Sequence, residues 1–387
     1  MKHSTERILT THVGSLIRPV EIIDAMRTRV NKKPYDEKGF AENLRKGVSE
    51  VVRQQAQVGI DVVSDGEFGK SGFAAYINER LGGFERRVGL GESGVSRGQD
   101  RRDFADFYRE LDRLTLIDRP VSAKWVCTAP ITYNSNLVET DIANFKQALG
   151  GVHVAEAFMP VAAPITVEMN SSNEFYPSQE AYLYAIAGAL KQEYTAIVDA
   201  GFLVQLDDPL ITARWDQLLP NIDVQEFQKF CEVRIEAANY ALANIPRDRI
   251  RYHVCWGSWH GPHSTDIPIK YLQPLLLKLK ADALLFEAAN VRHEHEWTVW
   301  QNVTLPEGTT LVPGVVTHAT NLIEHPELVA QRIVRLAKLV GRENVMAGTD
   351  CGFSQGPFSA KVHPSIQWAK LKALVEGAAL ASKELWH

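Results

Sequence analysis

The chain has 387 residues, of which 45% are hydrophobic and 23% charged, an ordinary composition for a globular protein. Its net charge of -5 at pH 7 argues against nucleic-acid binding, which needs a basic face. No apolar run reaches the roughly 18 residues that span a bilayer, and residues 1–7 lack the apolar segment of a secretory signal. Four cysteines in so long a chain do not make a disulfide framework, so we expect reduced thiols and a cytoplasmic protein.

Short β-rich stretches alternate with longer helical patterns along nearly the whole chain, which is typical of a parallel α/β fold. The predicted strands are residues 8–13, 61–64, 122–127, 164–169, 202–206, 250–255, 283–286, 311–316 and 345–347. Helical periodicity lies between them, for example over residues 179–200 and 326–340. We therefore predict one domain, a (β/α)8 TIM barrel over residues 1–387, with one accessory strand.

One segment interrupts this alternation. Residues 82–106 are rich in Gly, Arg and Asp and have weak periodicity. The segment is either a solvated insertion, which could contact another copy of the chain, or a lid that brings an arginine to an anionic substrate. Its arginines are Arg86, Arg87, Arg97, Arg101 and Arg102.

Polar residues that could do chemistry directly follow the predicted strands. They are Ser15, Asp65, Glu67, Asp207, Asp208, His253, Cys255, Glu287, Asp350 and Cys351. In a barrel, the carboxyl ends of the strands meet at one mouth and carry the active site. A single carboxylate there could as well cap a loop, but so many at one relative position favour a functional site.

Two cysteines and a histidine have the ligand chemistry that zinc prefers. His253 and Cys255 are two residues apart on one strand, so their side chains lie on the same face, and Cys351 follows a different strand. Such widely separated ligands can meet only through the fold, and Glu287 is the candidate fourth. Two further histidines, in a loop with Gly and Pro beyond the strand, are competing ligands: His260 and His263.

Several short motifs occur in a fixed order. They are Thr-Thr-His-Val-Gly-Ser at 10–15, Asp-Gly-Glu at 65–67, Gln-Leu-Asp-Asp-Pro at 205–209, His-x-Cys at 253–255 and Asp-Cys-Gly at 350–352. Together with Glu287, this order resembles the C-terminal catalytic barrel of the cobalamin-independent methionine synthases along nearly the whole chain. The resemblance implies a zinc enzyme whose Zn²⁺ ligands are His253, Cys255, Glu287 and Cys351.

The resemblance also implies that Ser15, Glu67 and Asp207 hold the amino-acid part of a homocysteine-like thiol. Two carboxylates suit an ammonium group, and a hydroxyl with backbone N–H groups suits a carboxylate. The alternative for Glu67 and Asp207 is a structural one, in which backbone donors hold a buried carboxylate.

The sequence departs from the family on the side of the methyl donor. Full-length members have an additional N-terminal barrel, and the family's folate-side tryptophan, arginine and glutamate fall near Asn170, Val126 and Ala213. The interval from Cys255 to Glu287 is also longer than in the family, so we expect extra residues around 257–269 to reshape the pocket rim. The identity of the methyl or alkyl donor is therefore left open.

The family's catalytic histidine corresponds to His318 only with a shift of one residue. Because such a shift would turn a strand side chain to the opposite face, the assignment of His318 as the proton donor is a hypothesis. Asp350 is a candidate for orienting a metal ligand.

We thus predict a zinc-dependent transferase that moves a methyl group to a small-molecule thiol, most simply homocysteine to give methionine. A second resemblance, through Cys-Trp-Gly at 255–257 and Gly-Pro-His at 261–263, is to the epoxyalkane:coenzyme M transferases. Glu67 and Asp207 speak against that alternative, because they would repel a sulfonate. A third alternative is a non-catalytic barrel with structural zinc. The oligomeric state stays open, and a homo-oligomer is compatible with the sequence.

Overall fold

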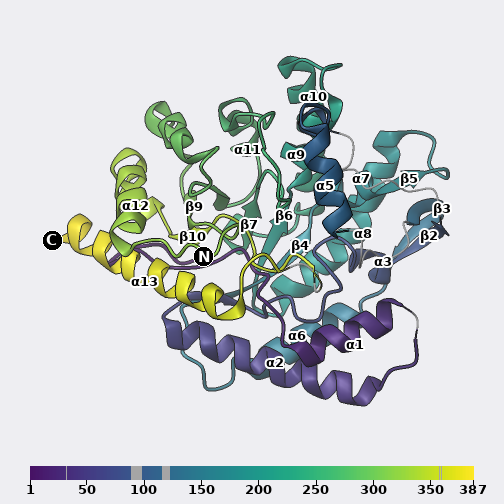
Figure 1. The fold of residues 1–387 in the computed structure, drawn as a ribbon, viewed down its shortest axis with the longest axis horizontal. Helices are drawn as coiled ribbons and strands as arrows, with labels where there is room; N and C mark the ends of the chain where they lie inside the picture. Colours follow the sequence, from purple (N-terminus) through teal and green to yellow (C-terminus); the bar gives the residue numbers. More distant parts are fainter. Residues whose placement is uncertain (32, 89–97, 116–122, 357, 359) are drawn as a thin grey trace.

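Parallel strands form a barrel at the centre of the molecule, and helices surround it (Figure 1). The computed structural model describes residues 1–31, 33–88, 98–115, 123–356, 358 and 360–387. The main sheet has seven strands in the order β1-β4-β6-β7-β8-β9-β10, and all recorded pairs within it are parallel. Their bounds are β1 Val62–Ser64, β4 Glu156–Ala162, β6 Leu203–Asp207, β7 Ile250–His253, β8 Ala283–Glu287, β9 Thr310–Val316 and β10 Gly348–Thr349.

The N-terminal segment closes the sheet into a barrel. Thr10 bridges Ala347, next to β10, and Thr11 bridges Val62 of β1, both in parallel. The Thr11 N–H donates to the Ala347 carbonyl at 2.8 Å, and the Val62 N–H donates to the Thr10 carbonyl at 3.0 Å. With this eighth segment, the predicted TIM barrel is confirmed.

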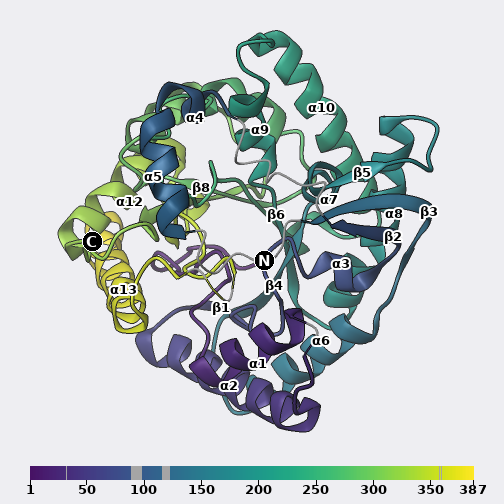
Figure 2. The same cartoon turned by 45° about the vertical axis from the view of Figure 1, so that its right-hand side comes forward.

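The helices form a ring outside the barrel. Neighbours contact one another in the order α2, α6, α8, α10, α11, the 3-10 helices η4 and η5, α12 and α13, and α13 contacts α2 again. Figure 2 shows α2, α6, α8, α10, α12 and α13 around the barrel. Their bounds are α2 Glu37–Val58, α6 Asn136–Ala148, α8 Gln179–Asp199, α10 Val224–Ala241, α11 Gln273–Leu276, η4 Ile269–Tyr271, η5 Glu294–Asn302, α12 Pro326–Val340 and α13 Pro364–Trp386. The remaining helices are α1 Val20–Val30, α3 Ile77–Arg80, α4 Gln99–Asp103, α5 Ala105–Thr115, α7 Pro164–Asn170, α9 Leu210–Leu218, η3 Arg247–Arg249 and η6 Arg342–Asn344.

Local signals in the sequence fix where several helices begin and end. The Asp36 side chain accepts the Gly39 N–H at the start of α2, and Gly59 ends that helix at φ 101°. Asp223 and Glu226 form a reciprocal capping box at the start of α10. These caps satisfy backbone groups that the helix itself leaves unpaired.

The predicted strand at residues 164–169 is wrong. These residues form α7, which begins with Pro164 at its first turn. Proline has no N–H for a strand ladder, and its fixed φ suits the start of a helix. The strand at this place in the barrel is β4. It pairs with β1 only up to Phe158, whereas its pairing with β6 continues to Ala162. Pro160 therefore has a paired strand on one side, β6, and none from β1 on the other.

The accessory strand belongs to a small second sheet outside the barrel. Its order is β2-β3-β5, with β2 Leu81–Val88, β3 Ala123–Tyr133 and β5 Ser171–Asn173. The predicted strand at 122–127 falls on β3, and part of the irregular segment predicted at 82–106 is the strand β2. Ser122 and Arg97 lie outside the described residues.

Two apolar clusters fill the fold. One lies within the barrel and includes Val13, Phe158, Leu285 and Val312. A larger one packs the helices against the outside of the strands. The buried guanidinium of Arg251 also lies inside, 3.8 Å from the centre of the Phe158 ring, and it donates to Thr11 Oγ1 and the His12 carbonyl. The interior is therefore a packed core, which leaves the strand ends as the place for chemistry.

Candidate metal centre

His253, Cys255 and Cys351 meet at the carboxyl ends of β7 and β10, as predicted. One ligand atom of each lies within 4.8 Å of the others, and the two sulfurs are 3.7 Å apart. All three side chains are buried. Gly314 of β9 makes this approach possible, because a Cβ there would lie 2.4 Å from the backbone of Asp350. A nitrogen and two sulfurs so close together match the donor set of a zinc site.

Glu287 lies beside this cluster at the end of β8. It is buried, and its charge acts on the pKa of both Cys255 and Cys351. Its Oε1 accepts the Trp256 N–H at 2.9 Å, and its Oε2 accepts the Asn290 amide at 2.6 Å. Among the described residues, the group within 4.8 Å does not include Glu287, so its role as fourth ligand stays a prediction.

The competing histidines are outside the cluster. His260 is exposed. His263 is buried, but Asp266 Oδ2 and the Trp259 carbonyl hold its two nitrogens at 3.0 and 3.2 Å. Its ring is stacked on Trp259. Neither histidine reaches the two sulfurs.

Hydrogen bonds favour the thiolate form of Cys351. The contact with Cys255 lowers the pKa of Cys351 and raises that of Cys255. Burial opposes the lowering, whereas His253 and the Ser258 hydroxyl, 3.3 Å away, support it. Gln355 Nε2 is a third neighbour at 3.7 Å.

Asp207 and Asp350 orient the His253 ring. Asp207 Oδ1 lies 3.1 Å from His253 Nδ1, and the Asp350 carbonyl lies 3.4 Å from Nε2. Burial opposes a charge on His253, but the hydrogen bond and charge of Asp207 outweigh it and raise its pKa to about 9. The Asp350 side chain accepts the N–H groups of Ala288 and Ala289, each at 2.9 Å. Asp207, predicted to bind substrate, thus also contacts a predicted metal ligand.

Ser15 and Glu67 lie at the same mouth of the barrel. A Cβ on Gly352, next to Cys351, would lie 2.0 Å from Ser15 Oγ, and the Ser15 carbonyl accepts the Phe353 N–H at 2.8 Å. Glu67 has the left-handed φ of 60°, rare for its residue type. Burial raises its pKa to about 7, and the negative charge of Asp207 acts in the same direction. The predicted substrate residues are therefore neighbours.

His318 is buried, and neither of its ring nitrogens has a hydrogen-bond partner among the described residues. Burial lowers its pKa well below its usual value, and the positive charges of Lys361 and His253 act in the same direction. The ring is therefore neutral in the folded protein.

Sequence reasoning missed three residues near the site. Burial lowers the pKa of Lys361 to about 8, and the negative charges of Cys351, Glu287 and Cys255 oppose this lowering. Arg18 joins two loops of the mouth by donating to the carbonyls of Glu67 and Ser354. Ser258 contacts the Cys351 sulfur. No sequence motif next to Lys361 or Arg18 indicates a place at the site. For Ser258, the one indication is that it lies in the extra residues expected after Cys255.

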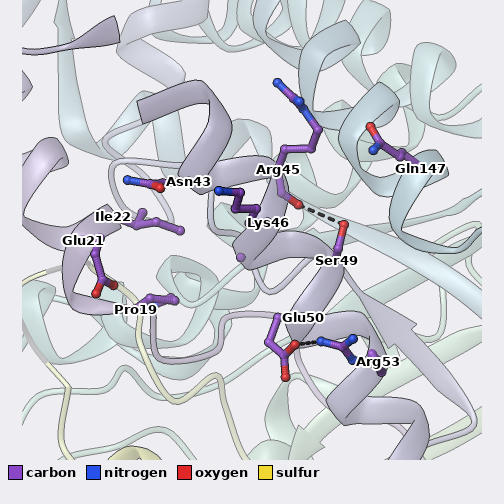
Figure 3. A pocket seen from close by; sticks show the side chains of 11 residues that line it. Pro19, Glu21, Ile22, Asn43, Arg45, Lys46, Ser49, Glu50, Arg53 and Gln147 are labelled. Carbon is purple, nitrogen blue, oxygen red and sulfur yellow. Dashed lines mark hydrogen bonds and ion pairs between the residues drawn. The ribbon is translucent and has the colours of Figure 1, made fainter. Parts of the chain in front are cut away.

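A separate hollow of about 590 Å³ lies among α1, α2 and α6 (Figure 3). It is lined by Pro19, Glu21, Ile22, Asn43, Arg45, Lys46, Gly47, Ser49, Glu50, Arg53 and Gln147, and none of these is a predicted site residue. Its charges are mixed, and Glu50 already pairs with Arg53 (Figure 3). The hollow carries no arrangement of groups that points to a ligand.

In the described part of the chain, no helix is both long and apolar enough to cross a membrane. All four cysteines are free thiols, as expected.

Comparison with known proteins agrees with the motifs. The family described as cobalamin-independent synthase, catalytic domain, matches residues 8–97 and 117–375. The methionine synthase of Sulfolobus acidocaldarius is 24% identical over 379 residues, which cover 97% of this chain and 93% of the relative. That of Sulfurisphaera tokodaii is 24% identical over 382 residues, with the same coverage.

A solved structure shows the same fold. It is a B12-independent methionine synthase from Shewanella sp. W3-18-1 in complex with selenomethionine, with a TM-score of 0.73 and 20% sequence identity. The match covers 98% of this chain and 99% of that one. The resemblance predicted from the motifs is confirmed, and the chain belongs to the family of cobalamin-independent synthase catalytic domains.

Proposed function

We propose that this protein is a zinc-dependent methyltransferase that converts homocysteine to methionine. The observation that carries the proposal is the buried cluster of His253, Cys255 and Cys351 beside the carboxylates Glu67 and Asp207. Family membership and the methionine synthases among the relatives support it.

His253, Cys255 and Cys351 would hold the zinc ion, with Glu287 as the nearby fourth group. Their imidazole nitrogen and two thiol sulfurs are ligands that zinc binds well. A zinc ion bound there would supply positive charge that favours the thiolate form of an acceptor sulfur at neutral pH.

The carboxylates would hold the amino group of the acceptor. Both hydrogen bonds recorded for the Asp207 carboxylate use Oδ1, from His253 and Gln205, which leaves Oδ2 for an ammonium. No described residue hydrogen-bonds the Glu67 carboxylate, although it is buried. The Ser15 hydroxyl lies close to Gly352 and would face the carboxylate end of the amino acid.

His318 would handle the proton. In the reaction, a bond forms between the acceptor sulfur and the methyl carbon, the bond from that carbon to the donor breaks, and the thiol proton passes to the donor's leaving atom. A neutral ring without protein partners is free to accept and return that proton. The burial of the site excludes water from it.

One observation favours the second function, addition of a sulfonated thiol to an epoxide. No described residue hydrogen-bonds or ion-pairs with the Lys361 ammonium, and the negative charges of Cys351, Glu287 and Cys255 act to raise the pKa of this lysine, which places it close to the cluster. It could therefore receive an anionic group such as a sulfonate.

Product masses separate the two functions. The zinc-loaded protein is incubated with homocysteine or coenzyme M, each with methyl-folate, methylcobalamin or an epoxide. We expect methionine from homocysteine with a methyl donor. A hydroxyalkyl thioether of coenzyme M as the product would instead establish the second function, and Lys361→Met should then abolish it.

A further inference from the structure

The residues of the proposed site are all buried, so a substrate can reach them only if a covering segment moves. Cys255 is 2% exposed, Cys351 5% and Glu67 2%. One segment that contacts the cluster is residues 257–266, which follow β7 and which we call the cap segment. Its Ser258 hydroxyl donates to Cys351 Sγ at 3.3 Å.

Helices α4 and α5 hold the cap segment in place. Asp100 Oδ1 accepts both the N–H and the hydroxyl of Ser264, at 2.9 and 2.5 Å. Asp100 Oδ2 accepts the Tyr108 hydroxyl at 2.7 Å, and that hydroxyl accepts the Trp259 indole N–H at 3.0 Å. Asp100 and Tyr108 are both buried, so these bonds are sheltered from water.

A third anchor joins both segments to α9. Asp216 Oδ1 accepts the Asp100 N–H at 2.8 Å and also accepts the Thr265 hydroxyl at 2.5 Å. A Cβ on Gly98 would lie 1.4 Å from Asp216 Oδ2, so only glycine permits this approach. The contact is thus a specific fit between two segments far apart in the sequence.

The cap segment is also tied inward towards the cluster. Trp259 is stacked on His263, which contacts Asp266 at 3.0 Å. Asp266 also contacts His293 at 3.0 Å, and the His293 ring is stacked on Trp256, with 3.6 Å between ring centres. Trp256 follows Cys255 directly. One face of the Trp259 indole is stacked on the His263 ring, and a Cβ on Gly257 would lie 2.2 Å from a carbon of the indole. The indole is therefore packed against the protein itself and has a structural role, and it does not offer a surface for stacking a substrate.

We propose that Asp100 is a positioning residue that holds the cap segment over the two cysteines, so that α4 and α5 control access to the metal centre. This inference rests on the proposed site at Cys255 and Cys351. It does not depend on which methyl donor or acceptor the protein uses.

The test is the rate at which N-ethylmaleimide modifies each cysteine of the metal-free full-length protein, followed by peptide mass spectrometry. In Asp100→Ala, we expect Cys255 and Cys351 to react at least about tenfold faster than in the wild type. Cys127 and Cys231, buried elsewhere, should keep their rates. Tyr108→Phe, which removes the hydroxyl and keeps the ring, should give the same selective increase.

Asp106→Ala is the matched control, since Asp106 is an exposed carboxylate on α5, and it should leave all four rates unchanged. In the zinc-loaded protein, transfer of zinc to a chelator should be faster in Asp100→Ala and Tyr108→Phe than in Asp106→Ala. Equal acceleration of all four cysteines would mean general unfolding and would overturn the proposal, as would unchanged rates at Cys255 and Cys351. Neither readout requires methyl transfer, so a wrong assignment of the reaction would not mimic these results.

Discussion

At the scale of single residues, contacts converge on Cys351. Cys255, Ser258 and Gln355 all approach its sulfur, and Gly314 and Gly352 leave room for the chain around it. Such polar neighbours at a buried sulfur support the proposal that Cys351 is a metal ligand.

Cys351→Ser should remove most of the bound zinc and reduce methyl transfer below detection, because a serine hydroxyl is a far weaker zinc ligand than a thiolate. Zinc content is measured by mass spectrometry of the metal after gel filtration. The control is Cys231→Ala, which removes a buried thiol distant from the cluster and should keep a full complement of zinc. A zinc-free Cys351→Ser protein with full activity would contradict the hypothesis that methyl transfer depends on bound zinc.

Glu67 should make amino-acid binding depend on pH. Burial raises its pKa to about 7, and only the carboxylate form can pair with an ammonium. Affinity for methionine, which has no thiol to ionise, should therefore rise as the pH rises through about 7 and level off above it. Calorimetric titration from about pH 5.5 to about pH 8.5 spans this pKa and measures the dependence.

Glu67→Gln should weaken methionine binding roughly 10- to 100-fold at about pH 8 and remove the rise with pH, since a charge-assisted hydrogen bond contributes about 1.5–3 kcal/mol. The control Glu42→Gln alters an exposed glutamate on α2 and should behave as the wild type. A Glu67→Gln variant with the wild-type pH profile would show that Glu67 does not bind the amino group.

The grouping of the three candidate ligands was predictable from residue chemistry, whereas its surroundings were not. His253, Cys255 and Cys351 are recognisable because their types and the two-residue spacing on a strand are specific. Lys361 and Arg18 reach the mouth from segments without a motif, so only the folded chain shows their place. The roles of Glu287 and His318 stay predictions.

At the scale of elements, the strand pattern predicted most of the barrel. Buried parallel strands are short apolar runs, and the runs at 202–206, 283–286 and 311–316 fall on β6, β8 and β9. The pattern failed between residues 156 and 170, where β4 contains Pro160 and α7 resembles a strand in composition. A short apolar run such as that of α7 does not distinguish a buried helix from a strand.

Gly314→Ala tests how closely β9 and the chain after β10 must approach. A Cβ there would meet the Asp350 backbone at 2.4 Å, so the Asp350–Cys351 turn must shift. We expect a loss of about 1–3 kcal/mol in the free energy of unfolding and weaker zinc retention. Gly188→Ala on α8, where the nearest atom lies 4.0 Å away, is the control and should retain zinc. Zinc affinity equal to the wild type in Gly314→Ala would contradict this account of the site.

The segment that links β8 to η5 should stabilise the fold in a pH-dependent way through His293. Burial opposes its charge, but hydrogen bonds to Asp266 and Glu296 outweigh it and raise its pKa to about 9 from an ordinary value of 6.5. A raised folded-state pKa gives stability that is fully present below about pH 6.5 and is lost as the pH rises through about 9.

Urea unfolding of the wild type and of His293→Gln measures this contribution. The difference in unfolding free energy should be largest below about pH 6.5, shrinking by on the order of 3 kcal/mol by about pH 9 to 10. A difference that stays constant over this range would mean that His293 is neutral in the folded protein.

At the scale of the whole molecule, the barrel brings ligands from distant parts of the chain to one mouth. Cys255 and Cys351 are 96 positions apart, yet β7 and β10, which they follow, end at the same side of one closed sheet. The second sheet and the helices α4 and α5 are additions at the periphery, and α4 and α5 reach the mouth through the cap segment. The barrel thus brings the candidate metal ligands together, while α4 and α5 contact the segment beside them.

The central claim is that this metal centre takes up the acceptor thiol. X-ray absorption at the zinc edge, recorded with and without homocysteine, tests it directly. With Cys255 and Cys351 as the protein sulfurs, we predict that homocysteine raises the number of sulfur neighbours from two to three. A sulfur count that stays at two with homocysteine, and with every other thiol tried, would contradict the account.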